Sequence, residues 1–226
     1  MKLQRLRRSN RFFAHTEGLL RRNAVLVCGL GLPFVVMAAT SLKSGVALAI
    51  GMYFAVVPST IFMSFIGERI PAYIRIMISA FVSLAFITIA GGIIKNITPE
   101  IFDWVGIYLP LMAVNSISIH RHECYAKKNR WYLSLLDGFL FSSGFALVTL
   151  VVSLLREFLG SGNIWGVSVM SFRMSAFGAV FMGFILLAFL AAGAQAARRV
   201  SLWVAYRRDN PGPKALLRQK LERGEE

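Results

Sequence analysis

Residues Gly106 to Ser116 have the sequence Gly-Ile-Tyr-Leu-Pro-Leu-Met-Ala-Val-Asn-Ser, in which Pro110 interrupts an apolar run and the polar pair Asn115-Ser116 follows it. Proline lacks the N–H group that an α-helix needs, and in lipid every carbonyl that it frees must find another partner. The stretch therefore predicts a broken membrane helix whose break faces protein or water.

The same frame occurs near the N-terminus. Residues Gly29 to Ala39, Gly-Leu-Gly-Leu-Pro-Phe-Val-Val-Met-Ala-Ala, place Pro33 in the same Gly-x-x-Leu-Pro-apolar pattern as Pro110. Matching interrupted segments in the two halves of a membrane protein indicate a central site at the interface between the repeats. The alternative is a pair of proline kinks in ordinary transmembrane helices.

The composition is that of an integral membrane protein. Apolar residues make up 56% of the chain and charged residues only 16%, and the mean hydropathy is +0.61. The net charge of +14 does not indicate nucleic acid binding, because the basic residues lie in the terminal segments and loops between apolar stretches. Of the two cysteines, Cys28 lies in an apolar stretch and Cys124 in a basic one, so a disulfide between them is not expected.

The apolar stretches predict an all-α fold of six transmembrane helices, with the first and fourth broken. A further local break is a candidate at Pro58, which Ser59 and Thr60 follow. A basic loop is expected at residues 120–130. The six helices are expected near residues 24–40, 45–66, 74–94, 101–119, 133–155 and 174–197.

The distribution of Lys and Arg predicts the orientation. With this span count, 21 of the 25 basic residues lie on the side of both termini, which is therefore expected to be the cytoplasmic side of a bacterial inner membrane. Three spans in each half make the two repeats inverted in topology. Residues 1–22 form a basic arm, either interfacial on anionic lipid or disordered, residues 23–197 the membrane domain, and residues 198–226 a basic tail.

Several motifs follow one another along the chain: the two Gly-x-x-Leu-Pro frames, Thr98-Pro99, Asn115, Arg121-x-Glu123-x-Tyr125-Ala126-x-Lys128, Leu136-Asp137-Gly138-Phe139 and Leu155-Arg156-Glu157-x-x-Gly160-x-Gly162. In their order and spacing the chain resembles a known family over roughly residues 23–197: the paired six-span membrane subunits of the Rnf and Na⁺-translocating NADH:quinone reductase complexes (RnfA/RnfE and NqrD/NqrE), and most of all RnfE/NqrD. The resemblance implies inverted repeats with two broken helices and a role in coupling electron transfer to Na⁺ or H⁺ movement. It also implies an oppositely oriented homologous partner and further flavin and iron-sulfur subunits.

The chain departs from the family at two positions. The resemblance implies a [2Fe-2S] cluster shared with the partner subunit, with cysteine ligands immediately before the first proline and just after the asparagine. Here these positions hold Leu32 and Ser116. Leucine cannot bind iron and serine is a poor substitute for a thiolate, so no cofactor is predicted in this chain. A cluster displaced to Cys28 and Cys124 would require both helices to shift.

Other polar residues allow two interpretations each. Asn115 and Ser116 can cap a broken helix or coordinate a cation through oxygen. Asp137 can be a proton or cation relay or form an interfacial ion pair. The three residues of His120-x-His122-x-Cys124 cannot converge on a metal if they lie on a helix, so a polar interfacial loop is expected there in preference to a metal site. Arg156-Glu157 is expected to be an anchor or subunit contact at the membrane face.

The sequence contains no phosphate-binding loop, nucleotide fingerprint or nucleophile-base arrangement, so any catalysis would need partner subunits. The first hypothesis is a membrane subunit of a redox-driven ion pump. The alternative is a cluster-free paralogue that acts as a transporter or channel around the same interrupted segments.

Overall fold

The computed structural model describes residues 23–67, 69–169 and 173–209. The chain divides into two compact units, residues 1–188 and 189–226, and the described part of the second unit is the C-terminal portion of one helix. The predicted basic arm, residues 1–22, and the predicted tail beyond residue 209 lie outside the described residues.

The first long helix, α3 (Leu42–Ile66), begins at a capping box. Ser41 Oγ accepts a hydrogen bond from the Ser44 N–H, and Ser44 Oγ accepts one from the Ser41 N–H. The local break considered at Pro58 does not occur, because α3 is continuous through it. The hydroxyl of Ser59 donates to the Ala55 carbonyl in the same turn and helps to satisfy the backbone around the proline.

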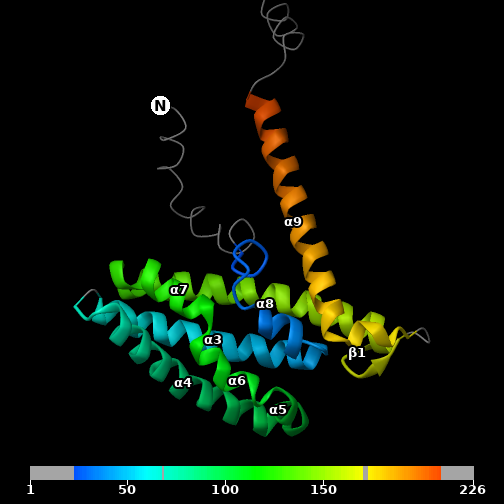
Figure 1. Cartoon of the computed structure of the whole chain (residues 1–226), viewed down its shortest axis with the longest axis horizontal. Helices are drawn as coiled ribbons and strands as arrows, with labels where there is room; N and C mark the ends of the chain where they lie inside the picture. Colours follow the sequence, from blue (N-terminus) through cyan, green and yellow to red (C-terminus); the bar gives the residue numbers. More distant parts are fainter. Residues whose placement is uncertain (1–22, 68, 170–172, 210–226) are drawn as a thin grey trace, which may run out of the picture. The chain divides into compact units, whose positions relative to one another are not determined.

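The helix α3 lies between α4 (Ala72–Ile97) and α8 (Trp131–Ser161), as Figure 1 shows. The two long helices α3 and α8 are antiparallel: Gly45, near the start of α3, contacts Ser153 near the end of α8, and Thr60 contacts Gly138 at the opposite ends. At both places a glycine lets the helices approach closely, which is the usual way in which membrane helices pack.

The helix around Pro110 is interrupted, as the sequence predicts. The chain forms α5 (Pro99–Val105), α6 (Tyr108–Leu111), the short 3-10 helix η2 (Met112–Val114) and α7 (Ser116–Cys124), with a bend of 54° across the break between α5 and α6. The expectation of a loop from residue 120 is wrong, since α7 continues to Cys124 and a 3-10 turn, η3 (Ala126–Lys128), follows.

The first predicted span, near residues 24–40, is not one continuous helix. Residues 24–31 form turns in which Gly29 and Gly31 have φ angles of +67° and +74°, a left-handed conformation that favours glycine. A short π-helix, η1 (Phe34–Ala38), follows Pro33. Both Gly-x-x-Leu-Pro frames therefore lie in irregular backbone.

Residues 162–209 contain a departure from the all-α expectation and the last long helix. Two short strands, β1 (Asn163–Ile164) and β2 (Val167–Ser168), form a hairpin, and the 3-10 helix η4 (Ser175–Gly178) and α9 (Val180–Asp209) follow.

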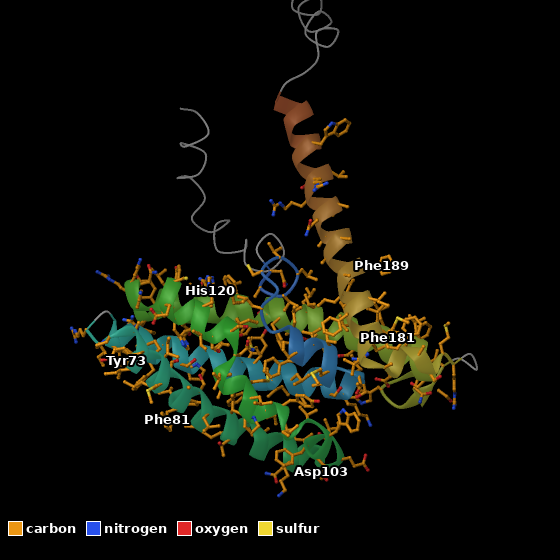
Figure 2. All side chains as sticks on the ribbon, in the orientation of Figure 1. Tyr73, Phe81, Asp103, His120, Phe181 and Phe189 are labelled. Atoms are coloured by element: carbon orange, nitrogen blue, oxygen red, sulfur yellow. The ribbon has the colours of Figure 1, made fainter. Side chains whose placement is uncertain are left out.

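Four helices in the described residues are long and apolar enough to cross a membrane, or five if the bent pair around Pro110 is one span. The protein is therefore a multi-pass helical membrane protein. Large apolar side chains such as Tyr73 and Phe81 project from α4 and are about 70% exposed in the isolated chain, as expected for a surface that meets lipid or another subunit (Figure 2).

Candidate functional site

The two interrupted segments meet. The backbone N–H of Gly31 donates a hydrogen bond of 3.2 Å to Ser116 Oγ, although the two residues lie 85 positions apart in the sequence. Leu32, which follows Gly31, and Ser116 are the two positions singled out from the sequence. We call Gly31, Leu32, Asn115 and Ser116 the junction.

Asn115 organises the second side of the junction. Its side chain is buried, its Oδ1 accepts the Ile117 N–H at 3.0 Å, and its Nδ2 points to Met52 Sδ at 3.4 Å. The backbone of Asn115 is extended, so its side chain caps the first turn of α7. The cap provides a partner for one of the N–H groups that the break leaves free.

Both long helices contact the junction. Met52 of α3 contacts Asn115 of the second segment, and a Cβ built on Gly31 of the first segment would lie 3.2 Å from the ring of Phe145 on α8. Each long helix therefore contacts the interrupted segment of the other half. Met52 of α3 and Phe145 of α8 are 93 residues apart in the sequence (145 − 52). The same interval relates the two glycine contacts between these helices, because it separates Gly45 from Gly138 and Thr60 from Ser153.

The side chains at the two family ligand positions do not fit an iron-sulfur cluster. Leu32 is half-buried and has no donor atom, while the Ser116 hydroxyl is exposed and accepts the Gly31 N–H. Cys28 and Cys124 are both exposed, and Cys124 Sγ lies 3.6 Å from His120 Nδ1. In the described part of the chain, no group of three or more His, Cys, Asp or Glu residues could hold a metal ion.

Both prolines lie at the surface of the chain, next to the junction or the bend. Pro33 is exposed and directly precedes η1, and Pro110 is exposed within α6. Pro110 borders an apolar groove of about 330 Å³ between α4 and the α5–α6 segment, and Lys95 lies at the groove with its ammonium 5.8 Å from the Phe102 ring. The break therefore leaves space beside it.

Asp137 forms an ion pair with Arg121 of α7. The guanidinium of Arg121 donates to both carboxylate oxygens, with 2.7 Å between Nε and Oδ2, and it also lies 3.9 Å from the centre of the Phe141 ring. Of the two roles considered for Asp137, the geometry is that of a partly buried ion pair, and the partner comes from the helix that contains the junction.

Sequence reasoning placed Arg156 and Glu157 at the membrane face, but both are buried. Arg156 is 1% exposed and donates to five backbone carbonyls, and Glu157 accepts the N–H groups of Leu42 and Gly166. The pair ties segments of this chain together. A charged pair at the end of an apolar run looks the same in the sequence whether it is an anchor at the membrane face or a buried link between segments of the chain. The five carbonyls belong to Val36, Ala39, Phe177, Gly178 and Ala179.

His122 is a buried residue that sequence reasoning considered as a metal ligand or, in preference, as part of a polar interfacial loop. It is 2% exposed and its Nε2 lies 3.0 Å from Ser59 Oγ. His120 and Cys124, by contrast, are exposed. The signal for a buried face was the spacing of Asn115, Ser118 and His122, which repeats at helical intervals.

Comparisons with known proteins agree with this architecture. The sequence pattern of the family described as "Rnf-Nqr subunit, membrane protein" matches residues 12–193. The chain is 33% identical over 148 residues to the E-type subunit of the ion-translocating oxidoreductase complex of Methanosarcina acetivorans, which covers 66% of this chain and 70% of the relative. It is 31% identical over 154 residues to the E-type subunit of the Na⁺-translocating ferredoxin:NAD⁺ oxidoreductase complex of Acetobacterium woodii, covering 68% and 79%.

Proposed function

This chain belongs to the Rnf-Nqr family of membrane protein subunits, and we propose that it is the E-type membrane subunit of a complex that couples electron transfer to the movement of Na⁺ or H⁺. The observation that carries the proposal is the meeting of the two interrupted segments at Gly31 and Ser116. Interrupted helices that meet inside a membrane domain offer free backbone groups and helix ends to an ion, and continuous helices do not.

The six-span inverted repeat is part of the proposal. Two features support it: α3 and α8 are antiparallel, and three pairs of contact positions on them are related by one sequence interval. A two-fold axis between these helices would exchange the contact of Gly45 and Ser153 with that of Gly138 and Thr60. Under this arrangement residues 24–40 are the counterpart of the broken segment around Pro110, and α9 is the counterpart of α4.

The proposed orientation places both termini in the cytoplasm of a bacterial cell, because 21 of the 25 Lys and Arg residues then lie on the cytoplasmic side. Reporter fusions after Arg208 should be active as cytoplasmic fusions, and fusions near Ser161 as external ones. An external C-terminus would contradict both the span count and the proposed type of subunit.

The proposed partners are a homologous, oppositely oriented six-span subunit and further subunits that carry flavin and iron-sulfur centres. The exposed side of the junction supports a subunit contact, because Pro33, Leu111, Val114 and Ser116 are all exposed there in the isolated chain. Purification from native membranes should recover such redox subunits together with this chain, and a chain that purifies alone would contradict the proposal.

We propose that this membrane pair does not hold the shared [2Fe-2S] cluster, since Leu32 and Ser116 supply no thiolate. The purified complex should lack an iron-sulfur signal that depends on this chain. The variant Leu32→Cys with Ser116→Cys should restore such a signal in electron paramagnetic resonance and iron analysis, whereas either substitution alone should not. A cluster in the unmodified chain that survives removal of Cys28 and Cys124 would contradict this assignment.

The missing thiolates also favour a second candidate, a cluster-free paralogue that acts as a transporter or channel. The neighbouring genes distinguish the two: genes for flavin and iron-sulfur subunits support the pump, and an isolated gene beside a solute-binding or regulatory protein supports the transporter.

A further inference from the structure

We propose that the cation conducted by this chain is a proton, and that His122 relays it through a buried polar seam formed by Ser59, Ser83, Asn115, Ser118 and His122. The inference rests on the proposed function and specifies its substrate. All five side chains are at most 2% exposed, and they come from α3, α4 and α7.

The seam extends from the junction along α7. Asn115, at the start of α7, contacts Met52 of α3, and His122 contacts Ser59. The step from Asn115 to His122 equals the step from Met52 to Ser59, so the two helices run parallel here. Ser118 lies between them on the same face of α7. The hydroxyls of Ser59 and Ser83 both donate to the Ala55 carbonyl, at 2.5 Å and 3.1 Å, which brings α4 into the seam.

The hydrogen bonds determine where His122 can take up a proton. Ser59 Oγ lies 2.5 Å from the Ala55 carbonyl and 3.0 Å from the Val56 carbonyl, and in the arrangement that we propose its single hydroxyl proton goes to one of them, so that Ser59 Oγ accepts the proton carried by His122 Nε2. In the neutral ring Nδ1 is then a free acceptor, and it has no hydrogen-bond partner among the described residues. Ser118 Oγ, one helical turn earlier, also has none. Two buried polar atoms without protein partners on one helix face indicate that water enters the seam.

The chemistry of the seam favours a proton over Na⁺. Imidazoles and hydroxyls form proton relays in membrane pumps, whereas hard cations require several oxygen ligands, usually with carboxylates. The nearest carboxylates on this helix and on α8 are already paired: Glu123 binds Arg75 and Lys127, and Asp137 binds Arg121. In one passage, Nδ1 takes a proton from a hydronium ion in the seam and leaves a water molecule, and the imidazolium later gives that proton from Nδ1 to a second water molecule further along the seam, so the ring ends in the tautomer in which it began.

Two measurements on the complex in membrane vesicles test the relay. Redox-driven acidification should proceed in Na⁺-free buffer and collapse with a protonophore, and His122→Gln should reduce it at least tenfold while the assembled complex is retained. His120→Gln is the matched control, since His120 lies on the same helix but is exposed, and it should have no effect. Two results would overturn the proposal: redox-driven ²²Na⁺ uptake that persists in the presence of a protonophore, or redox-driven acidification by the His122→Gln complex at the rate of the unmodified complex.

A third measurement does not depend on redox partners. In a chain whose Cys28 and Cys124 are replaced by serine, Ser118→Cys should react with a small water-soluble thiol reagent, and Leu48→Cys, which is fully buried among apolar groups of α3, should not. Equal protection of both cysteines would show that the seam is dry and would overturn the relay, even if the chain is a subunit of the redox complex. Labelling of Ser118→Cys supports the seam whether or not redox subunits are present, whereas purification of the chain from native membranes without redox subunits contradicts the proposed function alone.

Discussion

The backbone N–H of Gly31 donates a hydrogen bond of 3.2 Å to Ser116 Oγ, so one hydrogen bond joins the two interrupted segments, which contain Pro33 and Pro110. If Leu32 and Ser116 are both replaced by cysteine in a chain without Cys28 and Cys124, mild oxidation in membranes should form an internal disulfide. The two Cα atoms must be within about 7 Å for this to occur. Mass spectrometry of the cleaved chain measures the cross-link. The pair Leu32→Cys and His120→Cys, about 6 Å further along α7, is the control, and equal cross-linking of both pairs would contradict the junction.

The two glycine contacts between α3 and α8 make a prediction about stability. A Cβ on Gly45 would overlap Ser153, and one on Gly138 would overlap Thr60, so replacement of either glycine by alanine should destabilise the fold by about 1–3 kcal/mol. The thermal unfolding midpoint in detergent measures the loss.

Gly92→Ala is the matched control for both substitutions. Gly92 lies inside α4 with no atom within 4 Å of a built Cβ, so alanine there should leave stability unchanged or raise it by up to about 1 kcal/mol. Similar unfolding midpoints for all three variants would mean that α3 and α8 do not pack as described.

Arg156 should tolerate no substitution, including lysine. A lysine ammonium has three donors, whereas the planar guanidinium of Arg156 reaches five carbonyls, so Arg156→Lys should leave buried carbonyls unpaired at a cost on the order of 3 kcal/mol. The amount of folded protein extracted from membranes and its unfolding midpoint should both fall. Arg198→Lys, at an exposed position, should behave like the unmodified chain.

The ion pair of Asp137 and Arg121 predicts a stabilising role without a part in conduction. Asp137→Asn and Arg121→Gln should each lower stability, and the double variant should lose less than the sum, with a coupling of about 1–3 kcal/mol. Ion transport per assembled complex should persist in Asp137→Asn. Loss of transport by a well-folded Asp137→Asn would instead assign Asp137 to the relay.

The sequence predicted the parts of the fold that depend on local backbone chemistry. Pro110 and the glycines before Pro33 indicated irregular backbone, and irregular backbone occurs at both places. The same reasoning raised a candidate break at Pro58 that does not occur: α3 continues through it, and the hydroxyls of Ser59 and Thr60 bond to the carbonyls of Ala55 and Val57 in that turn.

The parts that depend on long-range contacts could not be predicted. Nothing local to Arg156 indicates that its five acceptors lie in two segments more than twenty and more than one hundred residues away. His122 was assessed with its neighbours His120 and Cys124, whereas its partner is Ser59 on another helix. The buried face of α7 became recognisable only once residues 116–124 were known to be helical.

The guanidinium of Arg156, on α8, donates hydrogen bonds to the carbonyls of Val36 and Ala39 at the end of the first interrupted segment. The same guanidinium also binds the carbonyls of residues 177–179. This end of the segment cannot shift together with Arg156 unless the hydrogen bonds between Arg156 and residues 177–179, which precede α9, also break. Any displacement of the segment during an ion cycle would therefore be larger at its other end, where Gly29 and Gly31 have the left-handed backbone that other residues avoid. That end lies on the N-terminal side of Pro33, directly beside Ser116.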